Sequence, residues 1–178
     1  MALPMPPLTV ARPEEILRPA RPWFVLLTLF LAVAGNLLPL SGVAQSLKPD
    51  FVALVLLYWC IHAPRYVGVG IAWFVGLLMD VGDATYFGQH ALAYAVLAYG
   101  AEYFRRRVLR FSPWQQAAQV AVLLGLCAAI VLLIRIVGGA PLPRWTYVVP
   151  SLVGALLWPL MSVVLQWPQR PPPSPAER

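Results

Sequence analysis

The fold of this chain is decided by the stretch Gly76-Leu-Leu-Met-Asp80-Val-Gly-Asp83-Ala-Thr-Tyr-Phe-Gly88-Gln89-His90-Ala-Leu-Ala-Tyr94, in which a short Gly/Asp turn joins two apolar segments. An acid, an amide and an imidazole therefore lie beside hydrophobic runs of membrane length. Polar side chains are costly within a membrane, so they need a structural or functional reason. Asp80 and His90 flank one predicted helical hairpin and can meet across it.

The composition indicates an integral membrane protein. Of the 178 residues, 60% are apolar and only 11% are charged, and the mean hydropathy is +0.72. A soluble domain usually carries about 25% charged residues. The apolar runs are continuous rather than alternating, which favours membrane helices over a barrel. We therefore expect an all-α fold, a polytopic bundle of about six transmembrane helices.

The runs divide the chain into three parts. Residues 1–22 form an N-terminal arm, residues 23–167 a transmembrane helical domain, and residues 168–178 a Pro-rich, disordered tail. The second and third runs are short for a bilayer core of about 30 Å, so a re-entrant pair remains an alternative to two full spans. The predicted helices cover residues 23–43, 51–63, 66–81, 85–104, 114–137 and 145–167.

The positive charges predict the orientation. With six spans and the N-terminus inside, ten Lys and Arg residues fall in cytoplasmic segments and two in outer loops, and Arg135 lies within a run. This excess is typical of cytoplasmic loops. Both termini are therefore expected in the cytoplasm, and the net charge of +6 is assigned to helix flanks and lipid headgroups rather than to nucleic acid.

The sequence carries no recognisable catalytic or metal-binding motif. It has no phosphate-binding glycine loop, no His pair with metal-ligand spacing and no nucleophile near a His. Cys60 and Cys127 lie inside apolar runs and are interpreted as packing residues. We therefore predict no enzyme activity, no catalytic residue, no cofactor and no metal site.

The polar and small residues near the hairpin have several interpretations. Asp80 can contact an ion or substrate, tie two helices together, or reach water at the outer interface. For Gln89 and His90, a hydrogen bond to a neighbouring helix is favoured over metal ligation. Small residues let helix backbones approach closely. The structural or partner-contact candidates are Pro49, Asp50, Gly68, Ala72, Gly76, Asp80, Gly88, Gln89 and His90.

The order and spacing of several motifs resemble the MreD family of rod shape-determining proteins. The resemblance covers roughly residues 23–167. It rests on Lys48-Pro49-Asp50-Phe51, Tyr58-Trp59, Gly76-Leu-Leu-Met-Asp80-Val, Gly88-Gln89-His90-Ala91-Leu92 and Tyr94.

The resemblance implies a multi-pass subunit of the bacterial inner membrane that supports rod shape and lateral peptidoglycan synthesis. Its implied partners are MreC, RodA, the elongation penicillin-binding transpeptidase and MreB, in addition to the membrane lipids expected from the basic residues. It also implies a fold similar to the substrate-binding subunits of energy-coupling-factor transporters. That fold leaves an alternative function, a small-molecule-binding subunit of a membrane transporter. The alternative predicts a polar pocket in the outer half of the bundle, lined by groups such as Asn36, Asp80 and Gln89.

Overall fold

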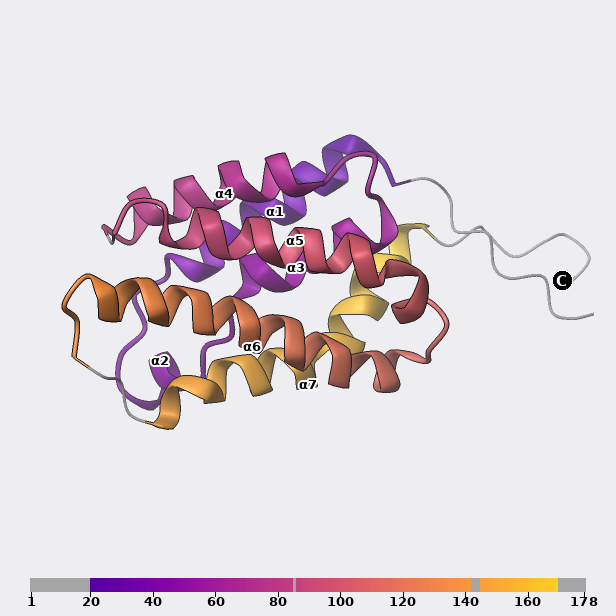
Figure 1. Cartoon of the computed structure of the whole chain (residues 1–178). Helices are drawn as coiled ribbons and strands as arrows, with labels where there is room; N and C mark the ends of the chain where they lie inside the picture. The colour runs from indigo at the N-terminus through magenta and orange to yellow at the C-terminus, as the bar shows by residue number, and fades with distance from the viewer. Residues whose placement is uncertain (1–19, 85, 142–144, 170–178) are drawn as a thin grey trace, which may run out of the picture.

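The computed structural model describes residues 20–84, 86–141 and 145–169, and these residues form helices joined by short connections (Figure 1). The predicted all-α class is confirmed over this part of the chain. The expected arm and tail fall mostly on residues 1–19 and 170–178, which lie outside the described residues. The α-helices are α1 (Pro22–Asn36), α2 (Val43–Leu47), α3 (Phe51–His62), α4 (Val69–Gly82), α5 (Gln89–Val108), α6 (Pro113–Val137) and α7 (Val149–Gln166), with 3-10 helices η1 (Trp145–Val148) and η2 (Trp167–Gln169).

Helix α3 is the centre of the bundle. Its residues from Val52 to Ile61 are each no more than 3% exposed. It packs against α1, α5, α6 and α7 (Figure 1), and its burial shows that its neighbours enclose it. The same burial explains its sequence, since a helix enclosed by other helices is apolar around its whole circumference. The indole N–H of Trp59 donates to the hydroxyl oxygen of Thr28 on α1 at 2.9 Å. The polar atom of this buried side chain therefore has a partner inside the bundle.

The first helix is shorter than the sequence predicts. We expected one helix over residues 23–43, but α1 ends at Asn36 and the chain bends before α2. Pro39 lacks a backbone N–H and disfavours helical geometry at the residue before it. Gly42 has φ +63°, a left-handed conformation that turns the chain into α2. Apolar character continues through this bend, and for that reason hydropathy alone misplaced the helix end.

The hairpin of α4 and α5 is packed backbone to backbone. Ala72 and Gly76, one turn apart on α4, are both buried. A Cβ at position 76 would lie 2.5 Å from Ala91 N and 2.6 Å from His90 C, closer than real Cβ atoms approach. Only glycine fits at this crossing. Helix α5 in turn packs on α6, and α6 packs on α7.

Two helical segments are long and apolar enough to cross a bilayer, Trp114–Val137 and Val149–Gln169. Helices α1 and α4 are apolar but shorter, with 15 and 14 residues. Many large apolar side chains on the outside of the bundle are exposed, as expected of a membrane protein. The count of six spans remains a prediction.

We predict that Gly76→Ala destabilises the protein by about 1–3 kcal/mol, because the added methyl group forces α4 and α5 apart. Gly70→Ala is the matched control on the same helix, since Gly70 is exposed and a Cβ there meets nothing within 4 Å. The control should be neutral or stabilising by about 0.5–1 kcal/mol. The free energy of unfolding of both variants is measured in mixed micelles titrated with a denaturing detergent. Equal stabilities of Gly76→Ala and Gly70→Ala would contradict the proposed crossing.

Candidate functional site

The carboxylate of Asp80, at the end of α4, accepts hydrogen bonds from the first turn of α5. Its Oδ2 accepts from Gly88 N at 2.8 Å and more weakly from Ala91 N at 3.4 Å, and its Oδ1 accepts from His90 N at 2.9 Å. The first N–H groups of a helix have no partner within the helix, and a negative charge there is favoured by the helix dipole. Gly88, the N-cap residue, has no side chain that could serve. Asp80 therefore caps α5 from the neighbouring helix.

Burial decides between the interpretations of Asp80. Asp80 is only 2% exposed. The interpretation of Asp80 as an interfacial carboxylate that reaches water is therefore wrong. Asp83, one turn later, is exposed instead. Gly88 adopts φ +97°, which closes the turn and brings the first N–H groups of α5 onto Asp80. A polar tie between two helices describes Asp80 best.

His90 and Gln89 extend this contact towards α6. His90 Nδ1 lies 2.8 Å from Asp80 Oδ1, so the two side chains meet across the hairpin. Because the carboxylate can only accept, Nδ1 carries the proton and Nε2 is the remaining ring nitrogen. Gln89 is fully buried, and its Oε1 accepts from Arg135 Nε at 3.4 Å. Asp80 and His90 thus join α4 to α5, and Gln89 and Arg135 join α5 to α6.

A second polar cluster lies around Asp50, the N-cap of α3. Its Oδ1 accepts from Ala53 N at 2.9 Å and from Asn36 Nδ2 at 2.8 Å, and its Oδ2 accepts from Tyr94 OH at 2.8 Å. Asn36 Oδ1 in turn accepts from Phe51 N at 2.9 Å. This cluster joins α1, α3 and α5. An Asp directly before an apolar run is a helix-start signal, but no local pattern indicates that Tyr94 completes the cluster.

Lys48 closes the C-terminal end of α1. Its Nζ donates to Asn36 O, and to Leu38 O at 3.2 Å. The last carbonyl groups of a helix lack internal partners and carry partial negative charge, so a cation is favoured there. Lys48 and Asp50 thus fix two helix ends on either side of Pro49.

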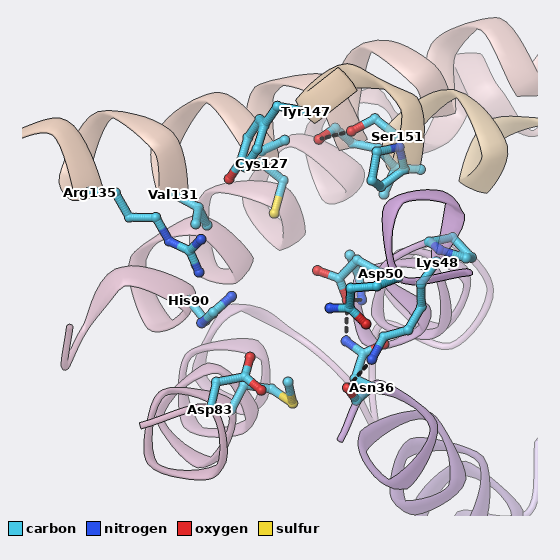
Figure 2. A pocket seen from close by; sticks show the side chains of 17 residues that line it. Asn36, Lys48, Asp50, Asp83, His90, Cys127, Val131, Arg135, Tyr147 and Ser151 are labelled. Atoms are coloured by element: carbon cyan, nitrogen blue, oxygen red, sulfur yellow. Dashed lines mark hydrogen bonds between the residues drawn. The ribbon is translucent and has the colours of Figure 1, made fainter. Parts of the chain in front are cut away.

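A cavity of about 240 Å³ lies between these clusters, where the ends of the helices meet (Figure 2). Charged side chains of both signs reach it from the turn after α4, from α6 and from the connection that precedes α3. Asp80 and Gln89 are buried beside it and do not line it. The lining residues are Asn36, Gln45, Lys48, Pro49, Asp50, Ala53, Met79, Asp83, His90, Leu124, Cys127, Ala128, Val131, Arg135, Tyr147, Pro150 and Ser151.

The candidate residues are divided between the two ends of the molecule. Pro49, Asp50 and His90 line the cavity, whereas Gly68 lies at the opposite end of α4, where an added Cβ would be 3.1 Å from Glu102 Oε1. Arg135 lies within a predicted apolar run, and its sequence position indicates no role. It reaches the cavity because Cys127, Val131 and Arg135 lie one turn apart on the same face of α6.

Within residues 20–84, 86–141 and 145–169, no three His, Cys, Asp or Glu side chains are grouped closely enough to hold a metal ion. The chemistry available at the cavity is hydrogen bonding and charge pairing. Its groups are carboxylates, an ammonium, a guanidinium, an imidazole, two side-chain amides and the hydroxyl groups of Tyr147 and Ser151.

We predict that Asp80→Ala lowers the free energy of unfolding by about 2–4 kcal/mol, because it removes a helix cap and leaves buried N–H groups without an acceptor. Asp80→Asn should fall between Asp80→Ala and the wild type, since it keeps one accepting oxygen and loses the charge. Asp83→Ala, in the same turn but exposed, should change stability by less than about 0.5 kcal/mol. Equal effects at positions 80 and 83, measured by detergent unfolding, would rule out the cap.

Comparisons with known proteins agree with the sequence motifs. The family model described as rod shape-determining protein MreD matches residues 18–167. The chain is 28% identical over 147 residues to the rod shape-determining protein MreD of Haemophilus influenzae. The aligned region covers 81% of this chain and 90% of that relative. No solved structure matches the chain, so the expected likeness to energy-coupling-factor subunits remains an expectation. The chain belongs to the MreD family of rod shape-determining proteins.

Proposed function

We propose that this protein is a non-catalytic inner-membrane subunit of the bacterial cell-elongation machinery. It supports rod shape and lateral peptidoglycan synthesis by binding MreC, with RodA, the elongation penicillin-binding transpeptidase and MreB as further partners. The observation that carries the proposal is the match of the MreD family model to residues 18–167, almost the whole helical part of the chain.

The arrangement of the polar residues supports a scaffold. Asp80, Asp50 and Lys48 are occupied by helix ends of their own chain, which fixes the relative positions of the helices. Ala72 and Gly76 are likewise buried inside the hairpin, so they act on a partner only through the fold. Contacts with partner helices and lipids fall to exposed apolar side chains, such as Trp73 and Phe74 on α4.

The proposed topology has six spans, with both termini in the cytoplasm. Helices α1, α3, α4, α5, α6 and α7 correspond to the six apolar runs, and the short α2 lies in the first outer connection. Arg105, Arg106 and Arg107 end α5 at the opposite end of the bundle from the α4–α5 turn (Figure 1). In this topology, the excess of Lys and Arg lies on the cytoplasmic side and the cavity lies at the outer end.

The cavity also favours the alternative function, in which the protein binds a small molecule. That alternative expected a polar pocket lined by Asn36, Asp80 and Gln89. Asn36 does line the cavity, but Asp80 and Gln89 have structural contacts beside it. A polar pocket fits ligand binding, but fold and pocket alone do not imply transport.

The scaffold function predicts loss of rod shape when the protein is depleted from its native bacterium. Crosslinking of membranes that contain a tagged wild-type copy should recover MreC with it. Normal shape after depletion, or purification without MreC, would argue against the proposal. Imaging of cell width and quantitative immunoblotting of the pull-down provide the two measurements.

In the same depletion strain, copies with Gly76→Leu or Asp80→Ala should give rounded cells and recover less MreC, because each change separates α4 from α5. Gly70→Leu is the control, since an added Cβ at Gly70 meets nothing within 4 Å. Protein levels are measured in parallel. Normal shape and normal recovery of MreC with both variants at wild-type levels would exclude a role for this hairpin in assembly.

A further inference from the structure

The cavity at the outer end holds charges that the helix caps do not use. Among the charged groups of its lining, Lys48 donates to two carbonyl groups, and both oxygens of Asp50 accept hydrogen bonds. The Asp83 carboxylate has no hydrogen-bond partner among the described residues, and Arg135 uses only its Nε, in the 3.4 Å contact with Gln89. Among the described residues, the two terminal nitrogens of Arg135 and the Asp83 carboxylate therefore have no hydrogen-bond partner and can bind a ligand.

These free groups lie on different sides of the cavity. Figure 2 shows the Arg135 side chain reaching from α6 towards His90, and Asp83, directly after α4, beyond His90. Among the described residues, only Asp80 and His90 form an ion pair within 4 Å. Arg135 and Asp83 therefore do not neutralise each other directly. An ionisable residue in a membrane helix without a close partner is the usual mark of a binding or transport function.

The charge of the lining selects the kind of ligand. Lys48 and Arg135 are balanced by Asp50 and Asp83, and His90 is paired with the buried Asp80. A purely anionic ligand would be repelled by the two carboxylates, and a purely cationic one by Lys48 and Arg135. A ligand that carries both charges can bind both kinds of group. A guanidinium binds an oxyanion through two parallel N–H groups, and a carboxylate accepts a hydrogen bond from an ammonium group.

The volume sets the size of the ligand. Engineered protein cavities of about 150 Å³ hold a benzene ring, so this cavity of about 240 Å³ has room for a group of roughly ten non-hydrogen atoms. Met79, Leu124 and Val131 provide an apolar wall beside the charged groups. Mixed apolar and convergent polar lining is typical of small-molecule sites.

We propose that this cavity binds a small zwitterionic group, with its oxyanion on Arg135 and its ammonium on Asp83. His90 Nε2 and the Tyr147 hydroxyl provide further hydrogen bonds to the bound group. The site goes beyond the scaffold function and does not depend on it. Two sources share this chemistry, a free amino acid or dipeptide and the headgroup of phosphatidylethanolamine.

The test uses the full chain in nanodiscs of phosphatidylglycerol, a lipid without an ammonium group. In one arm, alanylalanine is titrated and the rise in melting temperature is recorded. In the other, phosphatidylethanolamine is added in increasing fractions, and native mass spectrometry counts the molecules retained per protein. Saturable binding of one molecule in either arm is expected, and the responding arm identifies the source. Absence of saturable binding in both arms overturns the proposal.

Substitutions locate the binding. Arg135→Gln and Asp83→Asn should each weaken it by about tenfold or more, the usual effect of losing a hydrogen bond to a charged group. Arg106→Gln, at the far end of α5, should leave it unchanged. Ala128→Leu fills the cavity without changing a charge and should abolish binding, which keeps the test valid if a charge variant fails to fold. Binding that survives Ala128→Leu, or that responds to only one of the two charge variants, overturns the assignment.

Discussion

The fold depends on one buried carboxylate, that of Asp80, on the first turn of α5. Four contacts from Gly88, His90 and Ala91 saturate this group, and without them its burial would be unfavourable. Gly76 lies one turn earlier on the same helix, where α4 and α5 touch through their backbones. The close crossing brings the carboxylate within reach of α5, and the carboxylate in turn fixes the crossing. Each of the two features therefore needs the other.

The same principle operates at two neighbouring helix ends. Asp50 satisfies the start of α3, and Lys48 satisfies the end of α1. Helix ends are the places where backbone groups lack partners, and in an apolar environment water cannot replace those partners. Charged residues thus gather at one end of the bundle for structural reasons. Among the described residues of this group, Arg135 and Asp83 are those whose charged groups do not bind a helix end.

Local signals in the sequence predicted much of this architecture. Continuous apolar runs gave the all-helical class, and small residues at spacing of four gave the close face of α4. Local patterns do not show that Asp80 is buried while Asp83 is exposed, because this depends on how α4 is rotated against α5. The cavity was not predictable in detail, since its lining comes from segments as distant as Asn36 and Ser151. The end of α1 was misplaced because apolar residues continue past Pro39.

The complete enclosure of α3 has a consequence for the order in which the protein is assembled during synthesis. Of the helices that cover α3, only α1 precedes it in the chain, and α5, α6 and α7 all follow. A ribosome therefore releases α3 into the membrane before most of its final neighbours exist. With 12 residues, about 18 Å in length, α3 is also too short to span the bilayer core unaided. Its native environment is complete only when α7 has been made, so the centre of this bundle is among the last parts to be assembled.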